Sequence, residues 1–305
     1  MSSIQERLRG SIVPLVTPFD DQNRLDLATL RTLIDWQIRE GSHGISVGGT
    51  TGEPSALSLE ERKTQMRVTT EHVAGRVPVL LGSGSNNITE TLELTQYARE
   101  LGADAALVIV PYYNRPSQEG LFQHFYTVAR SVPDLPIVIY NIPGRTAANM
   151  EPATMKRLRK AAPNIVGVKE ANRDFEQVSN VLQACGRDFL VYSGIEALCY
   201  PMLMVGGAGH VSATANILPG KVAALYNLVR EGNWKEALNL HYELLPINQA
   251  LFWETNPAPV KSALGMMRRI RPHLRLPLVP ITDAHAKALE ELLIRYGLIE
   301  EEVKA

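Results

Sequence analysis

Short apolar runs rich in β-branched residues alternate with segments of helical spacing along the first three quarters of the chain. Runs that are apolar throughout are typical of strands buried on both faces of a parallel sheet. Eight runs of this kind lie at residues 10–16, 44–48, 77–82, 105–110, 136–140, 165–169, 189–193 and 209–212. Between them apolar residues recur every three or four positions, which predicts amphipathic helices. Two clear stripes are Leu27, Leu30, Leu33, Ile34 and Ile38, and Ile88, Leu92, Leu94, Tyr97 and Leu101.

Helix boundaries are marked by residues that suit helix caps. Ser58 precedes Leu-Glu-Glu, and Asn87 precedes Ile-Thr-Glu, so each is expected to be an N-cap. Gly41, Gly102 and Gly186 fall where helix C-caps are expected. These caps divide the chain into strand, helix and strand again.

The repetition of strand and helix eight times predicts an α/β fold, a (β/α)8 TIM barrel. A doubly wound open sheet is the alternative, and it would usually carry Gly-x-Gly-x-x-Gly after its first strand. The first run lacks that motif, and residues 82–87 have Asn87 where the third glycine belongs. The sequence therefore gives no support for a dinucleotide site.

The pattern changes near residue 231. Three segments with helical character follow, at 234–245, 259–267 and 283–296, separated by proline-rich breaks and without a further strand pattern. We therefore expect a catalytic barrel over residues 1–231 and a C-terminal helical domain over residues 232–305.

Composition excludes several classes of function. The chain has 305 residues, of which 45% are hydrophobic, and its 31 basic and 32 acidic residues leave a net charge of -1. Without a basic block, neither nucleic acid nor an anionic membrane is an expected partner. Two cysteines, Cys185 and Cys199, and an N-terminus without an apolar signal core indicate a reduced, cytoplasmic setting. The seven histidines show no zinc-binding spacing, so no metal site is expected.

Lys169 ends the sixth apolar run and is the most informative single residue. Burial disfavours the ammonium form of a lysine, and a neutral amine is a nucleophile that forms a Schiff base with a carbonyl substrate. The alternative is a lysine at a strand–loop junction whose ammonium group reaches water. Other strand ends decide between the two.

In a parallel barrel the C-terminal ends of the strands converge on one face, where active sites are built. Reactive residue types follow several of the predicted strands. They include Gly-Gly-Thr-Thr-Gly-Glu at 48–53, Pro-Tyr-Tyr-Asn-Arg at 111–115, Tyr140-Asn141, Arg145, Lys169, Ser193-Gly194 and Val211-Ser212. A tight turn, a core tyrosine or a surface arginine would explain each one alone. Their joint placement around Lys169 favours a catalytic site.

Four of these segments, in this order, closely resemble the dihydrodipicolinate synthase / N-acetylneuraminate lyase family of pyruvate-dependent class I aldolases. They are Gly-Thr-Thr-Gly-Glu (49–53), Pro-Tyr-Tyr-Asn-Arg-Pro-Ser (111–117), Tyr-Asn-Ile-Pro-Gly-Arg-Thr (140–146) and Gly-Val-Lys-Glu-Ala (167–171). The resemblance runs from Gly-Ser-Ile-Val-Pro-Leu-Val-Thr-Pro-Phe at 10–19 to Asn-Pro-Ala-Pro-Val-Lys at 256–261.

The resemblance implies a role for each matching residue. Lys169 matches the lysine that forms an imine with pyruvate, which then yields an enamine nucleophile. Tyr140 matches the tyrosine that moves protons at this centre, and Thr50 its relay hydroxyl. Tyr113 matches the tyrosine that reaches into a neighbouring subunit's site to complete the relay, and Thr51 matches the residue that holds the pyruvate carboxylate.

Three further matches concern substrates. Val211 and Gly194 match residues at the pyruvate pocket, and Arg145 matches the arginine that binds the carboxylate of aspartate semialdehyde. A planar guanidinium pairs well with a carboxylate. Ile195 stands where the family often has an acidic residue, which argues against a sugar-cleaving lyase.

The resemblance implies the condensation of pyruvate with aspartate semialdehyde in lysine and diaminopimelate biosynthesis. It also implies a homotetramer built as a dimer of dimers, and no cofactor other than the imine on Lys169. An aldolase or lyase of the same family that acts on another 4-hydroxy-2-oxoacid is the alternative. A non-catalytic barrel is a rival of another class, but such a chain should lack part of the lysine, tyrosine and threonine set.

Regulation by lysine can be judged at the positions that bind the effector in responsive family members. Asn86, Glu90 and Tyr112 are retained at these positions. Inhibited enzymes often have Ser, His and His at three further positions, where this chain has Pro54, Leu59 and Arg62. We therefore expect weak or absent inhibition by lysine.

Overall fold

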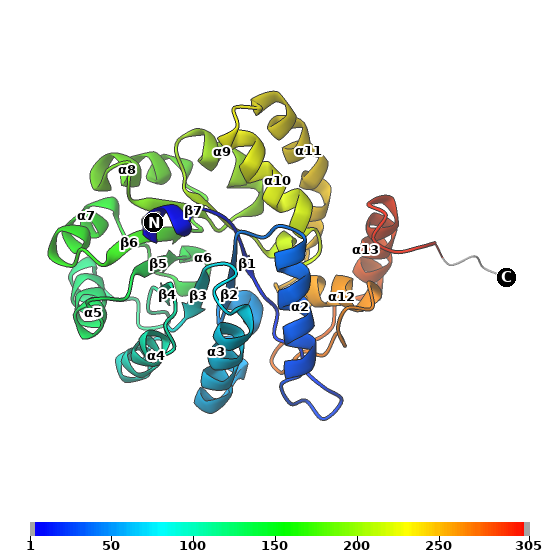
Figure 1. Ribbon diagram of the computed structural model, residues 1–305, viewed down its shortest axis with the longest axis horizontal. Helices are drawn as coiled ribbons and strands as arrows, with labels where there is room; N and C mark the ends of the chain where they lie inside the picture. Colours follow the sequence, from blue (N-terminus) through cyan, green and yellow to red (C-terminus); the bar gives the residue numbers. More distant parts are fainter. Residues whose placement is uncertain (1–3, 302–305) are drawn as a thin grey trace.

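Parallel strands close into a barrel in which each strand pairs with its neighbours in the sequence and β8 returns to β1 (Figure 1). The computed structural model describes residues 4–301. The strands are β1 (Gly10–Pro14), β2 (Gly44–Val47), β3 (Val79–Gly82), β4 (Ala105–Ile109), β5 (Ile137–Asn141), β6 (Ile165–Glu170), β7 (Leu190–Ser193) and β8 (Gly209–Val211). Each predicted run overlaps one of these strands, so the prediction of a (β/α)8 barrel is confirmed.

Helices follow the strands and form the outer layer of the barrel (Figure 1). The α-helices up to the last strand are α1 (Ile4–Arg7), α2 (Leu27–Arg39), α3 (Leu59–Val73), α4 (Ile88–Glu100), α5 (Gln118–Ser131), α6 (Pro143–Thr146), α7 (Pro152–Ala161), α8 (Phe175–Cys185) and α9 (Cys199–Met204). After β8 come α10 (Pro219–Arg230), α11 (Trp234–Ala250), α12 (Ala258–Met266) and α13 (Asp283–Arg295). Short 3-10 turns are η1 (Thr50–Gly52), η2 (Pro54–Ala56), η3 (Glu196–Leu198) and η4 (Ala213–Asn216).

The expected caps form. Ser58 accepts a hydrogen bond from the Glu61 amide while Glu61 accepts one from the Ser58 amide, which is a complete capping box at the start of α3. Asn87 caps α4 by accepting from the Thr89 amide. Gly41 and Gly102 follow their helices with positive φ, where a side chain would be strained.

Side chains alternate between two apolar layers. Ile12, Leu80, Leu107 and Val138 point into the barrel, whereas the alternate positions pack under the helices. At the N-terminal end Leu8 packs into the interior cluster, and its carbonyl accepts a hydrogen bond of 2.8 Å from the Tyr192 hydroxyl. That end is closed, so access to the interior is left to the C-terminal face.

The C-terminal helices match the predicted segments to within one residue, except at the end of the first. The segment expected to end at residue 245 continues as α11 to Ala250, through Pro246. A proline inside a helix removes one hydrogen bond. Here the next turn is retained because Ile247 and Ala250 are buried against the rest of the protein.

The last helices pack against the side of the barrel near α2, where Figure 1 shows α12 and α13 in orange and red. Arg269 lies over the ring of Trp36 on α2, 4.1 Å from its centroid. Lys261 on α12 forms a fully buried ion pair with Glu53, which follows η1. The division into domains at 1–231 and 232–305 stays a prediction, and residues 1–3 and 302–305, its outer ends, lie outside the described part of the chain.

Candidate active site

Lys169 and Tyr140 are neighbours on adjacent strands. They are partners in the register of β5 and β6, so both side chains project into the barrel near the C-terminal ends of these strands. The Lys169 Nζ lies 4.1 Å from the centroid of the Tyr140 ring. Each residue is only 4% exposed. The predicted strand-end position of the buried lysine is therefore observed, with an aromatic ring directly beside its amine.

Thr50 brings a hydroxyl to the same centre from the far side of the tyrosine. Its Oγ1 lies 3.3 Å from the Tyr140 hydroxyl oxygen, and either group can be the donor. Gly48 makes this turn possible, because its φ is +75° and a Cβ there would lie 2.6 Å from the Gly82 carbonyl oxygen on β3. The two hydroxyl groups can therefore exchange a proton, and the amine lies over the ring of the same tyrosine.

Gly194 and Val211 line the surroundings of the lysine. A Cβ at Gly194 would lie 3.1 Å from the Lys169 Cε and 2.9 Å from the Ala171 Cβ, so only glycine leaves the lysine stem its space. Val211 is buried in the interior cluster that also contains Tyr140. Gly194 thus lies directly beside the Lys169 side chain. The place of both residues in a pyruvate pocket stays a prediction.

Thr51 and Arg145 are joined through a residue that the sequence did not single out. The side-chain amide of Asn256 donates a 3.0 Å hydrogen bond to Thr51 Oγ1. Its backbone carbonyl accepts one of 3.3 Å from Arg145 Nη2. The only sequence signal was its place in Asn-Pro-Ala-Pro-Val-Lys, which gave no role to the asparagine.

Tyr113 is the one predicted site residue that the structure does not bring to the centre. Its side chain is 86% exposed and its φ is +77°. Within residues 4–301 of this single chain, no hydrogen bond joins Tyr113 to Thr50 or Tyr140. Its proposed role in a neighbouring subunit stays a prediction.

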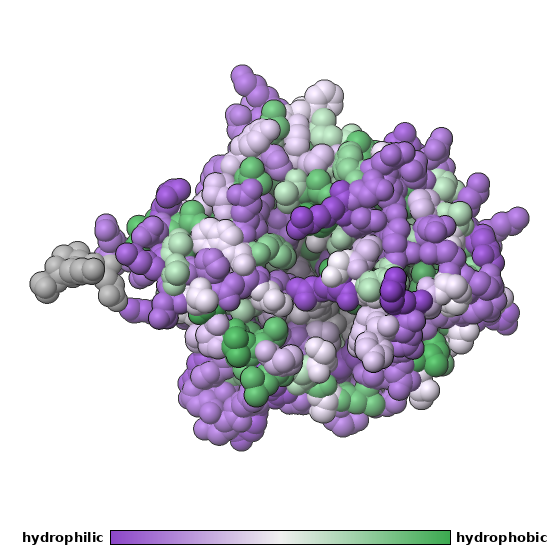
Figure 2. Space-filling view, turned by 180° about the vertical axis from the view of Figure 1, so that it is seen from behind, coloured by the Kyte–Doolittle hydropathy of each residue, from purple (hydrophilic) through white to green (hydrophobic). Residues whose placement is uncertain are grey.

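A cavity of about 490 Å³ opens beside this centre. Its lining includes Thr50, Tyr140, Arg145 and Asn256, and also Arg62 on α3, Glu90 on α4 and residues 84–86 before α4. The face opposite that of Figure 1 shows hydrophilic residues around a hollow near its middle (Figure 2). A substrate with carboxylate groups could therefore reach the phenol and the arginine from solvent.

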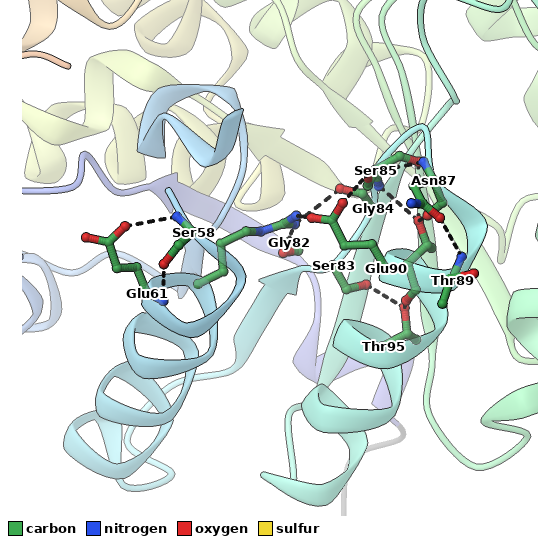
Figure 3. Close-up of polar contacts among 12 residues, drawn as sticks. Ser58, Glu61, Gly82, Ser83, Gly84, Ser85, Asn87, Thr89, Glu90 and Thr95 are labelled. Carbon is green, nitrogen blue, oxygen red and sulfur yellow. Dashed lines mark hydrogen bonds and ion pairs between the residues drawn. The ribbon is translucent and has the colours of Figure 1, made fainter. Parts of the chain in front are cut away.

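The cavity lining also includes most of the residues at the expected lysine-binding positions. Arg62 is 4% exposed, and its Nη1 lies 2.7 Å from Glu90 Oε1. Its Nη2 donates to the carbonyls of Gly82 and Gly84 at 3.3 and 3.2 Å. Figure 3 shows Glu90 on α4 facing the loop after β3, where Ser85 donates to its other oxygen at 2.9 Å. Both oxygens of this carboxylate are thus already bound.

Two buried carboxyl groups near the lysine were not assigned roles from the sequence. Glu170 follows Lys169 on β6 and accepts hydrogen bonds from Asn141 and Gln177, while burial raises its pKa to about 7. Glu196 accepts a 2.7 Å hydrogen bond from the Ala213 amide. Burial raises its pKa to about 7 as well, opposed in part by the hydrogen bond from the Ala213 amide. Each follows a predicted site residue closely, which is the signal that could have found them.

The described residues hold no group of three or more His, Cys, Asp or Glu side chains that could bind a metal ion. Nor does any helix within residues 4–301 have the length and apolar character needed to cross a bilayer.

Comparisons with known proteins show the family to which the chain belongs. The model of the dihydrodipicolinate synthetase family matches residues 7–295. The chain is 49% identical to a 4-hydroxy-tetrahydrodipicolinate synthase of Thermus thermophilus over 97% of this chain and 99% of the relative. It is 45% identical to a synthase of the same name from Nitratidesulfovibrio vulgaris, covering 96% of this chain and 100% of the relative.

A solved structure agrees as well. The crystal structure of dihydrodipicolinate synthase from Aquifex aeolicus is similar with a TM-score of 0.94 and 39% identity, over 96% of this chain and all of that one. These matches span essentially the whole barrel and the C-terminal helices, and they confirm the resemblance seen in the motifs. The chain therefore belongs to the dihydrodipicolinate synthetase family, a family of aldolase-type lyases.

Proposed function

We propose that this chain condenses pyruvate with aspartate semialdehyde, the reaction of a 4-hydroxy-tetrahydrodipicolinate synthase. The observation that carries the proposal is the cluster of Lys169, Tyr140 and Thr50, with the amine 4.1 Å from the ring centroid and the two hydroxyl oxygens 3.3 Å apart. The relatives that match over nearly the whole chain bear this name.

The first half of the reaction forms the nucleophile. The neutral amine of Lys169 attacks the keto carbon of pyruvate, water leaves, and a protonated imine results. The imine draws electrons from the adjacent carbon, so the pyruvate methyl group loses a proton and becomes an enamine. Tyr140 is placed to carry protons for these steps, and Thr50 to exchange them. Thr51 holds the pyruvate carboxylate.

The second half joins the substrates. The enamine carbon attacks the aldehyde of the semialdehyde, whose oxygen takes up a proton from the Tyr140 side. Arg145 is exposed at the mouth of the site and binds the substrate's own carboxylate. The amino group of the semialdehyde then attacks the imine carbon, which closes the ring and releases Lys169. The lysine thus supplies the electron sink, and the proposal needs neither a metal nor an organic cofactor.

The proposed assembly is a homotetramer of paired dimers, and the proposed location is the cytoplasm. The assembly is supported by Tyr113, a large aromatic residue that is 86% exposed in the single chain. In a dimer this side chain can reach the relay of the neighbouring subunit.

The test is turnover of pyruvate and aspartate semialdehyde, coupled to the next reductase and followed as loss of NADPH. Pyruvate with N-acetylmannosamine or with simple aldehydes runs in parallel, and Lys169→Ala is the control. Turnover with the semialdehyde alone, lost in Lys169→Ala, supports the proposal.

The alternative within the family rests on Ile195, which follows Gly194 at a position where the family often has an acidic residue. If pyruvate is trapped on Lys169 by borohydride but the semialdehyde does not react, the imine chemistry stands and the acceptor is a different aldehyde. If borohydride traps nothing, the chain is not an imine-forming enzyme.

A further inference from the structure

Asn256 connects two regions of the site that bind different substrates in the proposed function. It lies between α11 and α12, far in sequence from both of its partners, and is 6% exposed. Its side-chain amide donates to Thr51 Oγ1 at 3.0 Å, and its backbone carbonyl accepts from Arg145 Nη2 at 3.3 Å. It also lines the cavity next to Tyr140. One residue thus contacts both expected carboxylate-binding residues.

The direction of the bond to Thr51 matters. A hydroxyl group has one hydrogen to donate and two lone pairs that accept. Because Asn256 donates into a lone pair of Thr51, the hydroxyl hydrogen remains free to point at a substrate. A carboxylate accepts hydrogen bonds only, so it needs that hydrogen. Asn256 therefore holds Thr51 as a donor toward pyruvate.

The bond to Arg145 acts on the other substrate. A guanidinium has five N–H donors in a rigid fork, and one of them is fixed on the Asn256 carbonyl. Arg145 lines the cavity, and this bond leaves its guanidinium less freedom to rotate. The anchoring of the Asn256 side chain on Thr51 keeps this carbonyl in place.

Stability alone does not explain an asparagine here. Among the described residues the Asn256 Oδ1 is buried and has no hydrogen-bond partner. A buried amide oxygen without a donor is destabilising, and such groups are rare in folded proteins. The side chain is therefore held by its NH2 group alone, which is the group that Thr51 uses.

We infer that Asn256 is a positioning residue that orients the Thr51 hydroxyl toward the carboxylate of pyruvate and steadies Arg145 for the carboxylate of the second substrate. The inference rests on the proposed function for the identity of the second substrate. Its pyruvate part requires only that an oxoacid forms an imine on Lys169.

Two substitutions separate orientation from packing. Asn256→Asp has nearly the same shape but only accepts, so Thr51 must donate to it and is turned away from pyruvate. Asn256→Ala removes the contact and leaves the hydroxyl free to turn either way. We expect the pyruvate concentration for half-maximal borohydride trapping to rise more than about tenfold in Asn256→Asp and by several-fold in Asn256→Ala. A role in packing alone predicts the reverse order, since Asp fills the space and Ala does not.

A double-mutant cycle with Thr51→Val tests whether the effect passes through the hydroxyl. In the Thr51→Val background, Asn256→Ala should raise the half-maximal pyruvate concentration by less than about twofold. Full additivity of the two changes would overturn the inference. Ser55→Ala, an exposed polar residue on the same cavity, is the matched control and should leave pyruvate trapping unchanged.

Turnover measurements address the Arg145 part. We expect the KM for aspartate semialdehyde to rise in both Asn256 variants with a smaller change in kcat. An unchanged KM would remove this part of the inference. If the unmodified enzyme does not use the semialdehyde at all, the proposed function fails, whereas the trapping experiment still decides the orientation of Thr51.

Circular dichroism and thermal melting of each variant show whether it has folded. If Asn256→Ala does not fold, the comparison of Asn256→Asp with the unmodified enzyme decides whether Asn256 orients Thr51.

Discussion

The buried ion pair between Lys261 and Glu53 gives a prediction whose size can be worked out from the structure. Both side chains are completely buried. The Lys261 ammonium also donates to the His273 carbonyl at 2.8 Å and lies 4.2 Å from the centroid of the Phe19 ring. Glu53 belongs to the Gly-Thr-Thr-Gly-Glu segment of the site, so this pair fixes α12 to the loop that carries Thr50. We predict that Lys261→Met destabilises the protein more than Glu53→Gln does.

The two variants lose different amounts of stability because each leaves a different group buried without its counter-charge. Burial, opposed by Glu53, lowers the pKa of Lys261 to about 8 from 10.5, so the native state already disfavours this ammonium by about 3 kcal/mol. If Glu53 is lost, Lys261 can release its proton at pH 7 for only about 1 to 2 kcal/mol more. If Lys261 is lost, the buried Glu53 carboxylate keeps the 3.3 Å hydrogen bond from the Arg275 amide but loses its paired cation, which costs about 3 to 5 kcal/mol.

Equilibrium denaturation at pH 7 measures these differences, at fixed protein concentration for every variant. We expect a loss of about 3 kcal/mol for Lys261→Met and about 1 to 2 kcal/mol for Glu53→Gln. The double variant should be more stable than Lys261→Met, because no unpaired charge remains. Lys287→Met, which removes an exposed lysine on α13, is the control and should change stability by less than about 0.5 kcal/mol.

A larger loss for Glu53→Gln than for Lys261→Met would refute this reasoning, because it would mean that Lys261 cannot be neutralised. A double variant as unstable as the sum of the two single variants would show that the two groups do not act as a pair. Either outcome would remove the ion pair as the link between α12 and the site.

Three further predictions concern the site and its surroundings. Tyr140→Phe removes the hydroxyl beside Thr50 and should lower turnover by about 100-fold or more in the coupled assay. Turnover within about tenfold of that of the unmodified enzyme would contradict a role for this hydroxyl in proton transfer. Lysine should inhibit the unmodified enzyme only above millimolar concentration, because Arg62 and Ser85 already bind both oxygens of Glu90. The Arg62→Ala variant should bind lysine more tightly, as measured by calorimetry. Equal affinity of the two proteins for lysine would exclude this explanation. The raised pKa of Glu196, about 7, means that the native state retains a proton that the unfolded chain loses above about pH 4.5, so this group's contribution to stability falls as the pH rises toward 7. Glu196→Gln should therefore gain stability relative to the unmodified protein between about pH 5 and 8, by up to about 3 kcal/mol, and a constant difference across that range would show that Glu196 does not titrate there.

The sequence alone located most of the elements and the chemical centre. Strand positions followed from apolar runs because both faces of a barrel strand are buried, so the pattern does not depend on which neighbour covers which face. Caps such as Ser58 and Asn87 were predictable because their hydrogen bonds stay within a few residues. Lys169 stood out because a cation at the end of a buried strand needs a reason to be there.

Some boundaries depended on contacts that the local pattern does not contain. β5 and β6 each extend one residue beyond the prediction, to Asn141 and Glu170, which pair with each other through hydrogen bonds of 2.9 and 3.1 Å. Helix α11 continues through Pro246 because the following turn is buried. In both cases packing between distant segments outweighs local propensity.

The sequence thus determined the barrel, its family motifs and the residue types at the reactive centre, because each of these is encoded in short-range spacing. Only the tertiary structure decided which polar groups meet. It placed Asn256 against Thr51, Arg62 against Glu90 and Lys261 against Glu53, pairs that join separate elements of the chain. The free energy of a buried polar group depends on the partner beside it, and that partner is fixed only when the barrel closes and the C-terminal helices pack against it.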